Sequence, residues 1–220
     1  MEFLKIHPNL QICFPGLAAQ IVRFHDITVK RELRELEDYK LEVIKETQEK
    51  WEVEKLRDAP EFRAYRDFFW KLDIDPTKNR PAAEALIRRV LRDRPIQKIN
   101  TWVDAYNLVS IITAIPIACF DIDLLEGDLL MREAVAGEEF LGIAMKESIT
   151  LKGGEAVIED GARLVAIYPY RDADYSKVSH NTKNVLMLMC GAPGITLEKL
   201  NTSALEAIKV LPRFCGGTVE

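Results

Sequence analysis

The densest group of reactive side chains in this sequence is a polar stretch that follows a predicted strand. Tyr170, Arg171 and Asp172 come first, and Ser176 and His180 follow soon after. A loop at the end of a strand often carries substrate contacts, and a histidine among hydroxyl groups can act as a general base. We therefore predict a ligand site here, with His180 as the catalytic candidate and the other four residues as substrate-binding candidates.

These side chains also have an ordinary structural interpretation. Arg171 and Asp172 could form a surface ion pair in a turn, and such pairs are common and weak. His180 could hydrogen-bond to the backbone of its own loop. The residues alone leave both interpretations open.

A second group of residues is defined by its charge. Residues 60–100 hold ten Lys and Arg against six Asp and Glu, whereas the whole chain has a net charge of −5. Nucleic-acid binders usually show a basic surface, so such a partner would have to meet a local patch. The candidates for contacts with RNA phosphates are Arg66, Lys78, Arg80, Arg88 and Arg89. The alternative is a solvated helix face, balanced by neighbouring acids.

A third group is a polar quartet inside an apolar run: Asn100, Asp104, Asn107 and Asp121. Asn100 precedes a helical pattern and has the side chain of an N-cap. Asp104 and Asn107 are three residues apart, so they share one face of that helix. We expect Asn107 and its neighbour Tyr106 to bind substrate, and the other members to be largely structural.

Several classes of site have no motif in this sequence. The three histidines are scattered, no two cysteines form a CxxC pair, and no glycine-rich phosphate loop is present. We therefore expect no metal and no cofactor. The four cysteines lie far apart and are expected to be buried thiols. The N-terminal residues lack the apolar core of a signal peptide, and no apolar run is long enough to span a membrane. We expect a cytoplasmic protein without membrane contacts.

The elements that must position these residues can be read from the hydrophobic pattern. Strands are predicted at residues 2–7, 12–14 and 18–24, followed by a long helix from about residue 29 to the turn before Pro60. Further helices are predicted at 60–72, 82–93, 100–115 and 196–217, the last of them capped by Thr202 or Ser203. Short strands separated by glycines fill 117–125, 129–170 and 185–189, which predicts an antiparallel meander or small sandwich. The fold class is α+β.

The stretch from Asn100 to Gly127 also resembles a known family. The tRNA-binding and editing B3/4 module of the phenylalanyl-tRNA synthetase beta subunit has a VDxxN-x-V helix, a proline, and an FDxDxL strand that ends before a glycine. The matching residues here are Val103, Asp104, Asn107, Val109, Pro116, Phe120, Asp121, Asp123, Leu125 and Gly127. The resemblance covers most of residues 60–195, and the stretch from Tyr65 is similar to free-standing members of the family. It implies a single domain over 1–220, with a strand and long helix at about 1–58 as an N-terminal extension.

The resemblance implies an activity and a place for it. The family's module hydrolyses tyrosine wrongly attached to the phenylalanine tRNA, in a pocket between its two subdomains. At the position of a family histidine this chain has Ala118, and Leu188 or Met189 stands where the family has an acid. The family's glycine-rich pocket loop corresponds to residues 167–171, which lack glycine.

The resemblance leads to three alternative functions. The first is a free-standing, editing-like protein that binds tRNA or aminoacyl-tRNA and hydrolyses the ester of a mischarged amino acid with a positioned water. The second is a non-catalytic RNA-binding module. The third is a protein that binds an amino acid or related metabolite in the same cleft.

Overall fold

The computed structural model describes residues 2–220. Its helices are α1 (Pro8–Cys13), α2 (Arg34–Lys50), α3 (Pro60–Lys71), α4 (Ala82–Val90), α5 (Thr101–Thr113) and α6 (Leu197–Cys215), with short 3-10 turns η1 (Leu56–Asp58) and η2 (Ile122–Leu124). Its strands are β1 (Glu2–Phe3), β2 (Lys5–Ile6), β3 (Ala19–His25), β4 (Ile117–Asp121), β5 (Leu130–Glu133), β6 (Glu139–Phe140), β7 (Ile149–Thr150), β8 (Ala156–Glu159), β9 (Leu164–Ile167), β10 (Arg171–Asp172), β11 (Val185–Cys190) and β12 (Thr218–Val219).

The strands form two main sheets. Sheet A has the order β1-β3-β11-β4, with β12 also paired to β3, and all its pairs are antiparallel. Sheet B has the order β10-β9-β8-β5-β2, in which only β2 and β5 run parallel. Strands β6 and β7 form a separate small ribbon. Consecutive strands β8, β9 and β10 are neighbours, so the predicted antiparallel meander is confirmed there.

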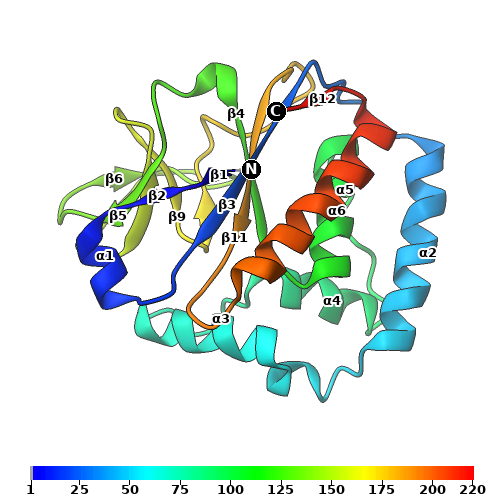
Figure 1. Cartoon of the computed structure of the whole chain (residues 1–220), viewed down its shortest axis with the longest axis horizontal. Helices are drawn as coiled ribbons and strands as arrows, with labels where there is room; N and C mark the ends of the chain where they lie inside the picture. Colours follow the sequence, from blue (N-terminus) through cyan, green and yellow to red (C-terminus); the bar gives the residue numbers. More distant parts are fainter. Residues whose placement is uncertain (1) are drawn as a thin grey trace.

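Sheet A is the middle layer of the molecule (Figure 1). Helices α5 and α6 contact sheet A and each other, and α2 and α4 pack on α5. Sheet B lies on the opposite side (left in Figure 1), and buried residues of both sheets share one core cluster. The predicted α+β class is confirmed, and sheet A has a helical layer on one face and a second sheet on the other.

The start of α5 shows how local sequence fixes this arrangement. The Asn100 side chain accepts a hydrogen bond from Val103 N at 2.9 Å, and the Asp104 carboxylate accepts one from Ile99 N at 3.0 Å. These bonds satisfy backbone donors that a helix start leaves unpaired. At the other end of the motif, Asp121 accepts a 2.6 Å hydrogen bond from Thr182 Oγ1. The structural roles expected for Asn100 and Asp121 are therefore confirmed.

Three boundary predictions were wrong. Residues 12–14 are not a strand, because α1 begins at Pro8, where His7 caps the helix and proline suits its first position. Helix α2 begins at Arg34 and ends at Lys50, much shorter than the charge pattern predicted. Helix α6 is capped by Thr196, whose side chain accepts from Lys199 N, rather than by Thr202 or Ser203.

The buried face of α2 is not purely apolar. In α2 the buried positions are Leu36, Lys40, Val43 and Thr47, whereas Leu41 is 66% exposed. The Lys40 stem is covered while its ammonium group pairs with Glu37 at 3.1 Å, so a long cation fills a core-facing position.

The cysteines divide between core and surface. Cys119, Cys190 and Cys215 are buried thiols, as predicted, but Cys13 is exposed. Cys13 is the last residue of the short α1, whose only buried residue is Leu10.

The N-terminal segment is built into both sheets. Strand β3 is an interior strand of sheet A, between β1 and β11, and β2 pairs with β5 at the edge of sheet B. The strands up to His25 therefore share hydrogen-bonded sheets with the rest of the chain, and α2 packs on α4 and α5. Their treatment as an extension of the domain stays a prediction.

Candidate ligand-binding cavity

Two cross-strand rows face each other between sheets A and B. In sheet B, Ile158 pairs with Ala166, and Ala166 pairs with Asp172. In sheet A, Leu188 pairs with Ala118. Residues directly opposite each other in an antiparallel pair point to the same face. All five line one cavity, with a volume of about 120 Å³.

The remaining walls come from segments that the fold brings to the same place. They are Ala82, Pro116, Ile117, Ile167, Tyr168, Pro169, Tyr170, Arg171 and Cys190. The buried Tyr168 hydroxyl donates a 2.6 Å hydrogen bond to Gly191 O. Tyr65 of α3 donates in the same way to Cys190 O at 2.6 Å. Two buried tyrosines thus anchor neighbouring elements to the end of β11 beside the cavity.

Asp172 is the one carboxyl group among the cavity-lining residues. It is half-buried, and burial raises its pKa to about 7. Within residues 2–220 its side chain forms no hydrogen bond or ion pair. The cavity therefore combines apolar walls with a carboxyl group that can gain or lose a proton near neutral pH.

The side chain of the preceding residue points elsewhere. Arg171 pairs with Ile167, which belongs to the smaller core cluster beyond sheet B, whereas Ala166 faces the main core. The Arg171 guanidinium lies 5.3 Å from the Tyr170 ring centroid and donates to Ile143 O at 3.4 Å. Arg171 and Asp172 are therefore not an ion pair, contrary to the ordinary interpretation of the sequence.

A second cavity of about 410 Å³ adjoins the first, because Ile167, Tyr168 and Tyr170 line both. Its other walls include the end of α3 and the turn before β8, with Lys71 and Lys152 among them. The two cavities together form a small apolar chamber beside a larger one whose lining carries two lysines and two acids, Asp73 and Glu155.

The structure brings together three of the predicted substrate-binding residues and separates the others from them. Tyr170, Arg171 and Asp172 line the small cavity. Tyr106 does not line it but lies within electrostatic range of Asp172, and burial raises the Tyr106 pKa well above its usual value. Asn107 is half-buried in α5 and lines neither chamber.

Ser176 and His180 lie near the other end of β4. The Ser176 carbonyl accepts a hydrogen bond from Asp121 N, and Thr182, two residues after His180, donates to the Asp121 carboxylate. The cavity is lined by Ala118, which lies three positions before Asp121 in β4, or roughly 10 Å away along the strand. His180 is exposed and Ser176 is fully buried. Their roles stay predictions, and neither side chain lines the cavity.

Two of the predicted RNA-binding residues are paired with a buried acid, and the other three are exposed, with Lys78 also 4.0 Å from the Asp75 carboxylate. Arg66 makes two hydrogen bonds to the buried Glu84, at 2.8 and 2.9 Å, and Arg88 makes a third at 2.8 Å. This explains why Glu84 lies on the buried face of α4, which the sequence pattern did not predict. Lys78 and Arg80 are exposed on the loop between α3 and α4. Arg89 is also exposed and donates to Pro95 O.

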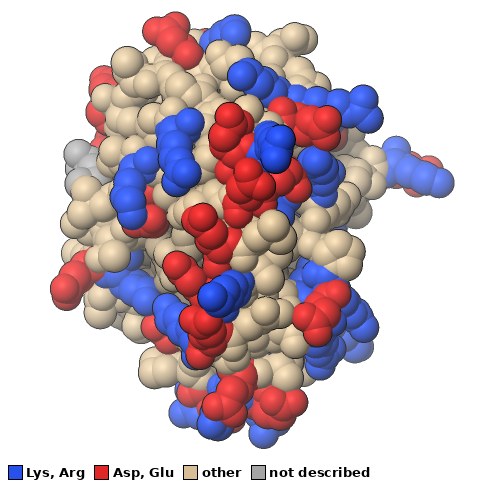
Figure 2. Space-filling view, turned by 90° about the vertical axis from the view of Figure 1, so that its right-hand side faces the viewer, with Lys and Arg blue, Asp and Glu red and all other residues tan. Residues whose placement is uncertain are grey.

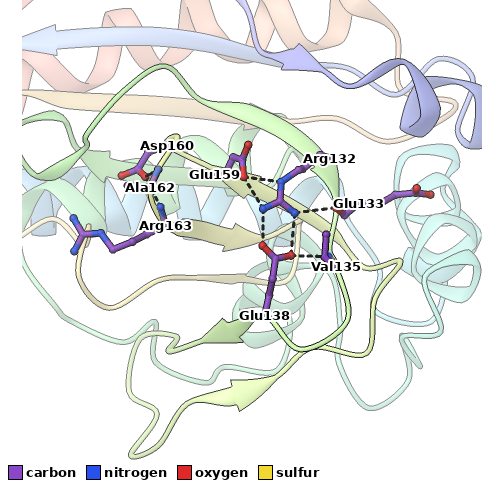
Figure 3. Close-up of polar contacts among 8 residues, drawn as sticks. All are labelled: Arg132, Glu133, Val135, Glu138, Glu159, Asp160, Ala162 and Arg163. Atoms are coloured by element: carbon purple, nitrogen blue, oxygen red, sulfur yellow. Dashed lines mark hydrogen bonds and ion pairs between the residues drawn. The ribbon is translucent and has the colours of Figure 1, made fainter.

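Another cavity of about 420 Å³ lies on the outer side of sheet B, and both of its cations are engaged: Arg163 pairs with Glu126, and Arg132 is held by two acids. Arg132 bonds Glu138 at 2.6 and 2.9 Å and Glu159 at 2.6 Å (Figure 3). Glu138 also accepts from Val135 N. This network joins β5, β8 and the turn after β5, which is a structural role.

Some of the residues that line the cavity could be identified from the sequence, and others could not. The resemblance had marked position 118, position 188 or 189, and positions 167–171; Ala118, Leu188 and residues 167–171 line the cavity, and Met189 does not. Ile158 and Ala166 were visible only as alternating strand residues, because facing sheets are a property of the topology.

Within residues 2–220, no three His, Cys, Asp or Glu side chains gather so that they could hold a metal ion. None of the helices in this range has the length and apolar character to cross a bilayer.

Comparisons with known proteins agree with this architecture. The family model of the B3/4 domain matches residues 64–207. The phenylalanine–tRNA ligase beta subunit of Geobacter sulfurreducens is 34% identical over 108 residues, which cover 49% of this chain and 13% of that protein. The same subunit of Fusobacterium nucleatum subsp. nucleatum is 27% identical over 186 residues, covering 84% of this chain and 22% of that protein.

A solved structure shows the same fold. An N-terminal fragment of the phenylalanyl-tRNA synthetase beta subunit from Pyrococcus horikoshii superposes with a TM-score of 0.52 at 14% identity, over 98% of this chain and 49% of that one. The chain thus spans less than a quarter of the length of these two curated relatives. Because the family model covers well over half of its residues, the chain belongs to the B3/4 domain family.

Proposed function

We propose that this protein binds the aminoacylated end of a tRNA and hydrolyses the ester bond of a wrongly attached amino acid. The observation that carries the proposal is the cavity between the two sheets. It lies at the positions that the family resemblance assigns to a pocket, and Ala118, Leu188 and the segment 167–171 line it. The relatives are named as tRNA ligase subunits, which supports a tRNA partner.

The two adjoining chambers suit the two parts of such a substrate. The small chamber of about 120 Å³ is lined mainly by apolar side chains and can hold a small aminoacyl group. The chamber of about 410 Å³ is large enough for the terminal nucleoside, since typical ligand pockets start at roughly 300 Å³. The ester would then lie beside Tyr168 and Tyr170, which line both chambers.

The proposed chemistry is the addition of a positioned water to the ester carbonyl. Holding the ester and the water in a fixed geometry removes much of the entropic barrier, and backbone N–H groups can stabilise the oxyanion that forms. The narrow apolar chamber favours this step because it excludes bulk water and fixes the acyl group. The adduct then breaks the ester C–O bond: the ribose oxygen of the tRNA leaves and takes up the proton that the water gives up, and the free amino acid is released.

The exposed cations near the two chambers support the RNA part of the proposal. The loop between α3 and α4 starts at residues that line the large chamber, including Leu72 and Ile74, and ends at Ala82, which lines the small one. Lys78 and Arg80 are exposed on this loop, and Lys71 lines the large chamber. Such cations are suited to contacts with the phosphates next to the bound nucleoside.

A deacylation panel tests the proposal. Purified protein is mixed with tRNAs that carry different wrong amino acids, and the rate of ester loss is compared with the spontaneous rate. The proposal predicts faster loss for at least one pair. Retained tRNA binding without hydrolysis of any pair would instead favour the non-catalytic RNA-binding module. Absence of tRNA binding would favour the metabolite-binding alternative.

A further inference from the structure

Asp172 points from sheet B into the small cavity between the sheets. Asp172 shares a cross-strand row with Ala166 and Ile158, and that row faces the Ala118–Leu188 pair of sheet A. The carboxyl group is therefore contributed by sheet B to a cavity whose opposite wall is apolar.

Asp172 also differs from the other buried or half-buried acids in having no partner. Glu84 is held by Arg66 and Arg88, Asp121 by Thr182, and Asp160 by Tyr175 and three backbone N–H groups. The Asp172 carboxyl makes no such contact within the described chain. A partly dehydrated carboxylate without a partner carries a desolvation cost that a positively charged ligand can offset.

Within residues 2–220 no cation is paired with the Asp172 carboxyl group. The titratable groups in electrostatic range are Tyr106 from α5, Cys119 from β4 and Cys190 from β11. Burial raises the pKa of all three well above their usual values, so they are neutral at pH 7. On its own strand, the neighbouring Arg171 also lines the cavity, but its guanidinium donates to Ile143 O and makes no ion pair with Asp172. The α4 residue that lines the cavity is Ala82, and β8 and β9 contribute only apolar side chains.

We propose that Asp172 makes this cavity selective for ligands that bring a protonated amine into it. The amine could be the α-ammonium of an aminoacyl group or the side-chain ammonium of a lysine-like residue, because both offer the same charge and three donors. The proposal rests on the proposed function only where it takes the ligand to be an aminoacyl ester. Binding of an amine beside Asp172 does not depend on ester hydrolysis. It makes Asp172 a specificity-determining residue.

The test uses two matched pairs of small probes. L-Alaninamide and its α-hydroxy counterpart lactamide differ in the α-ammonium, whereas Nα-acetyl-lysinamide and Nα-acetyl-norleucinamide differ in the side-chain ammonium. Affinities are measured by NMR titration for the wild-type protein, Asp172→Asn and Asp172→Ser. The matched control is Asp174→Asn, because Asp174 pairs with Lys177 and lines the outer cavity instead.

The expected result is that the amine member of at least one pair binds the wild type and the control at least about tenfold more tightly than its neutral counterpart, as hydrogen bonds to charged groups allow. Both Asp172 variants lose this preference. The pair that shows it identifies the source of the amine. Equal binding within both pairs, no binding of any probe, or a preference that survives in the Asp172 variants overturns the inference.

These outcomes are separable from those of the proposed function. Deacylation without an amine preference leaves the proposed function standing and removes the role of Asp172. An amine preference without deacylation of any tRNA supports the role of Asp172 and counts against hydrolysis.

Discussion

At the residue scale, the behaviour of Asp172 follows from its unpaired burial. A free Asp has a pKa of about 3.9, whereas in the folded protein burial raises the Asp172 pKa to about 7. Between these values the folded state binds more protons than the unfolded state. The contribution of this group to the free energy of unfolding therefore falls as the pH rises from about 4 to about 7. Above about pH 7 the contribution no longer changes with pH.

Asp172→Asn is predicted to remove this dependence. The variant should be more stable than the wild type by roughly 1–3 kcal/mol at about pH 8, and nearly equal to it at about pH 4. Urea unfolding of both proteins across this range measures the difference. Parallel stability curves would mean that the carboxyl is solvated or paired in solution.

A second prediction at this scale separates structural from RNA-facing arginines. Arg88 bonds the fully buried Glu84 at 2.8 Å, whereas Arg80 is exposed and makes no hydrogen bond or ion pair within residues 2–220. Removing one partner of a buried ion pair leaves an imperfectly compensated charge. Arg88→Ala should lower the free energy of unfolding by about 2 kcal/mol. Arg89→Ala, next to it on the exposed side, should change it by less than ~0.5 kcal/mol.

Arg80→Ala is expected to show the opposite pattern. It should leave stability unchanged and weaken tRNA binding at low salt, with a shallower dependence of affinity on salt concentration. Binding measured at several salt concentrations checks this. An unchanged salt dependence would remove Arg80 from the RNA contact surface.

At the scale of elements, the end of β11 holds the cavity together. Tyr168 donates to Gly191 O and Tyr65 to Cys190 O, each at 2.6 Å, and both tyrosines are buried. Because the two bonds are alike, each Tyr→Phe change should cost a similar ~1–2 kcal/mol of stability. Tyr168 lines both chambers and Tyr65 lines neither. Only Tyr168→Phe should therefore also weaken the binding of ligands in the cavity.

Unfolding curves and probe titrations on Tyr168→Phe and Tyr65→Phe check this prediction together. Equal effects of both changes on ligand affinity would show that the cavity responds only to general stability.

The elements also show what a sequence can and cannot predict. Helices α3 and α5, the strands from β4 to β9 and strand β11 follow from periodicity and from caps such as Asn100, because their signals are local. Strand β10 was not predicted: Arg171 and Asp172 were expected in a loop, and they pair with β9 instead. The buried face of α4 could not be predicted, because burial of Glu84 depends on Arg66 from another helix. The cavity rows could not be predicted from alternation alone, because the pairing of Asp172 with Ala166 decides which residue faces sheet A. The family resemblance predicted where the cavity lies, whereas only the strand pairing shows that the Asp172 carboxyl group faces into it.

At the scale of the whole molecule, the charges are distributed unevenly over the surface. Helix α2 exposes acids at three- and four-residue spacing: Glu35, Asp38, Glu42, Glu46 and Glu49. Figure 2 shows a column of acidic side chains on the face that carries α2, with Lys and Arg beside it. This face is unfavourable for RNA. In the proposed complex, a tRNA would instead approach the side of the α3–α4 loop, where the exposed cations Lys78 and Arg80 lie next to both chambers.

The central claim is that the small cavity between the sheets holds the aminoacyl group during hydrolysis. Ala118→Leu places a larger side chain in that cavity, whereas Ala162→Leu changes an exposed turn between β8 and β9 and is its matched control. The most direct measurement is the deacylation rate of a mischarged tRNA with each variant, alongside tRNA affinity. We predict that Ala118→Leu loses at least about tenfold in rate, or ~1.4 kcal/mol of transition-state stabilisation, and retains tRNA binding, with Ala162→Leu like the wild type. Hydrolysis by Ala118→Leu at the wild-type rate would contradict the claim.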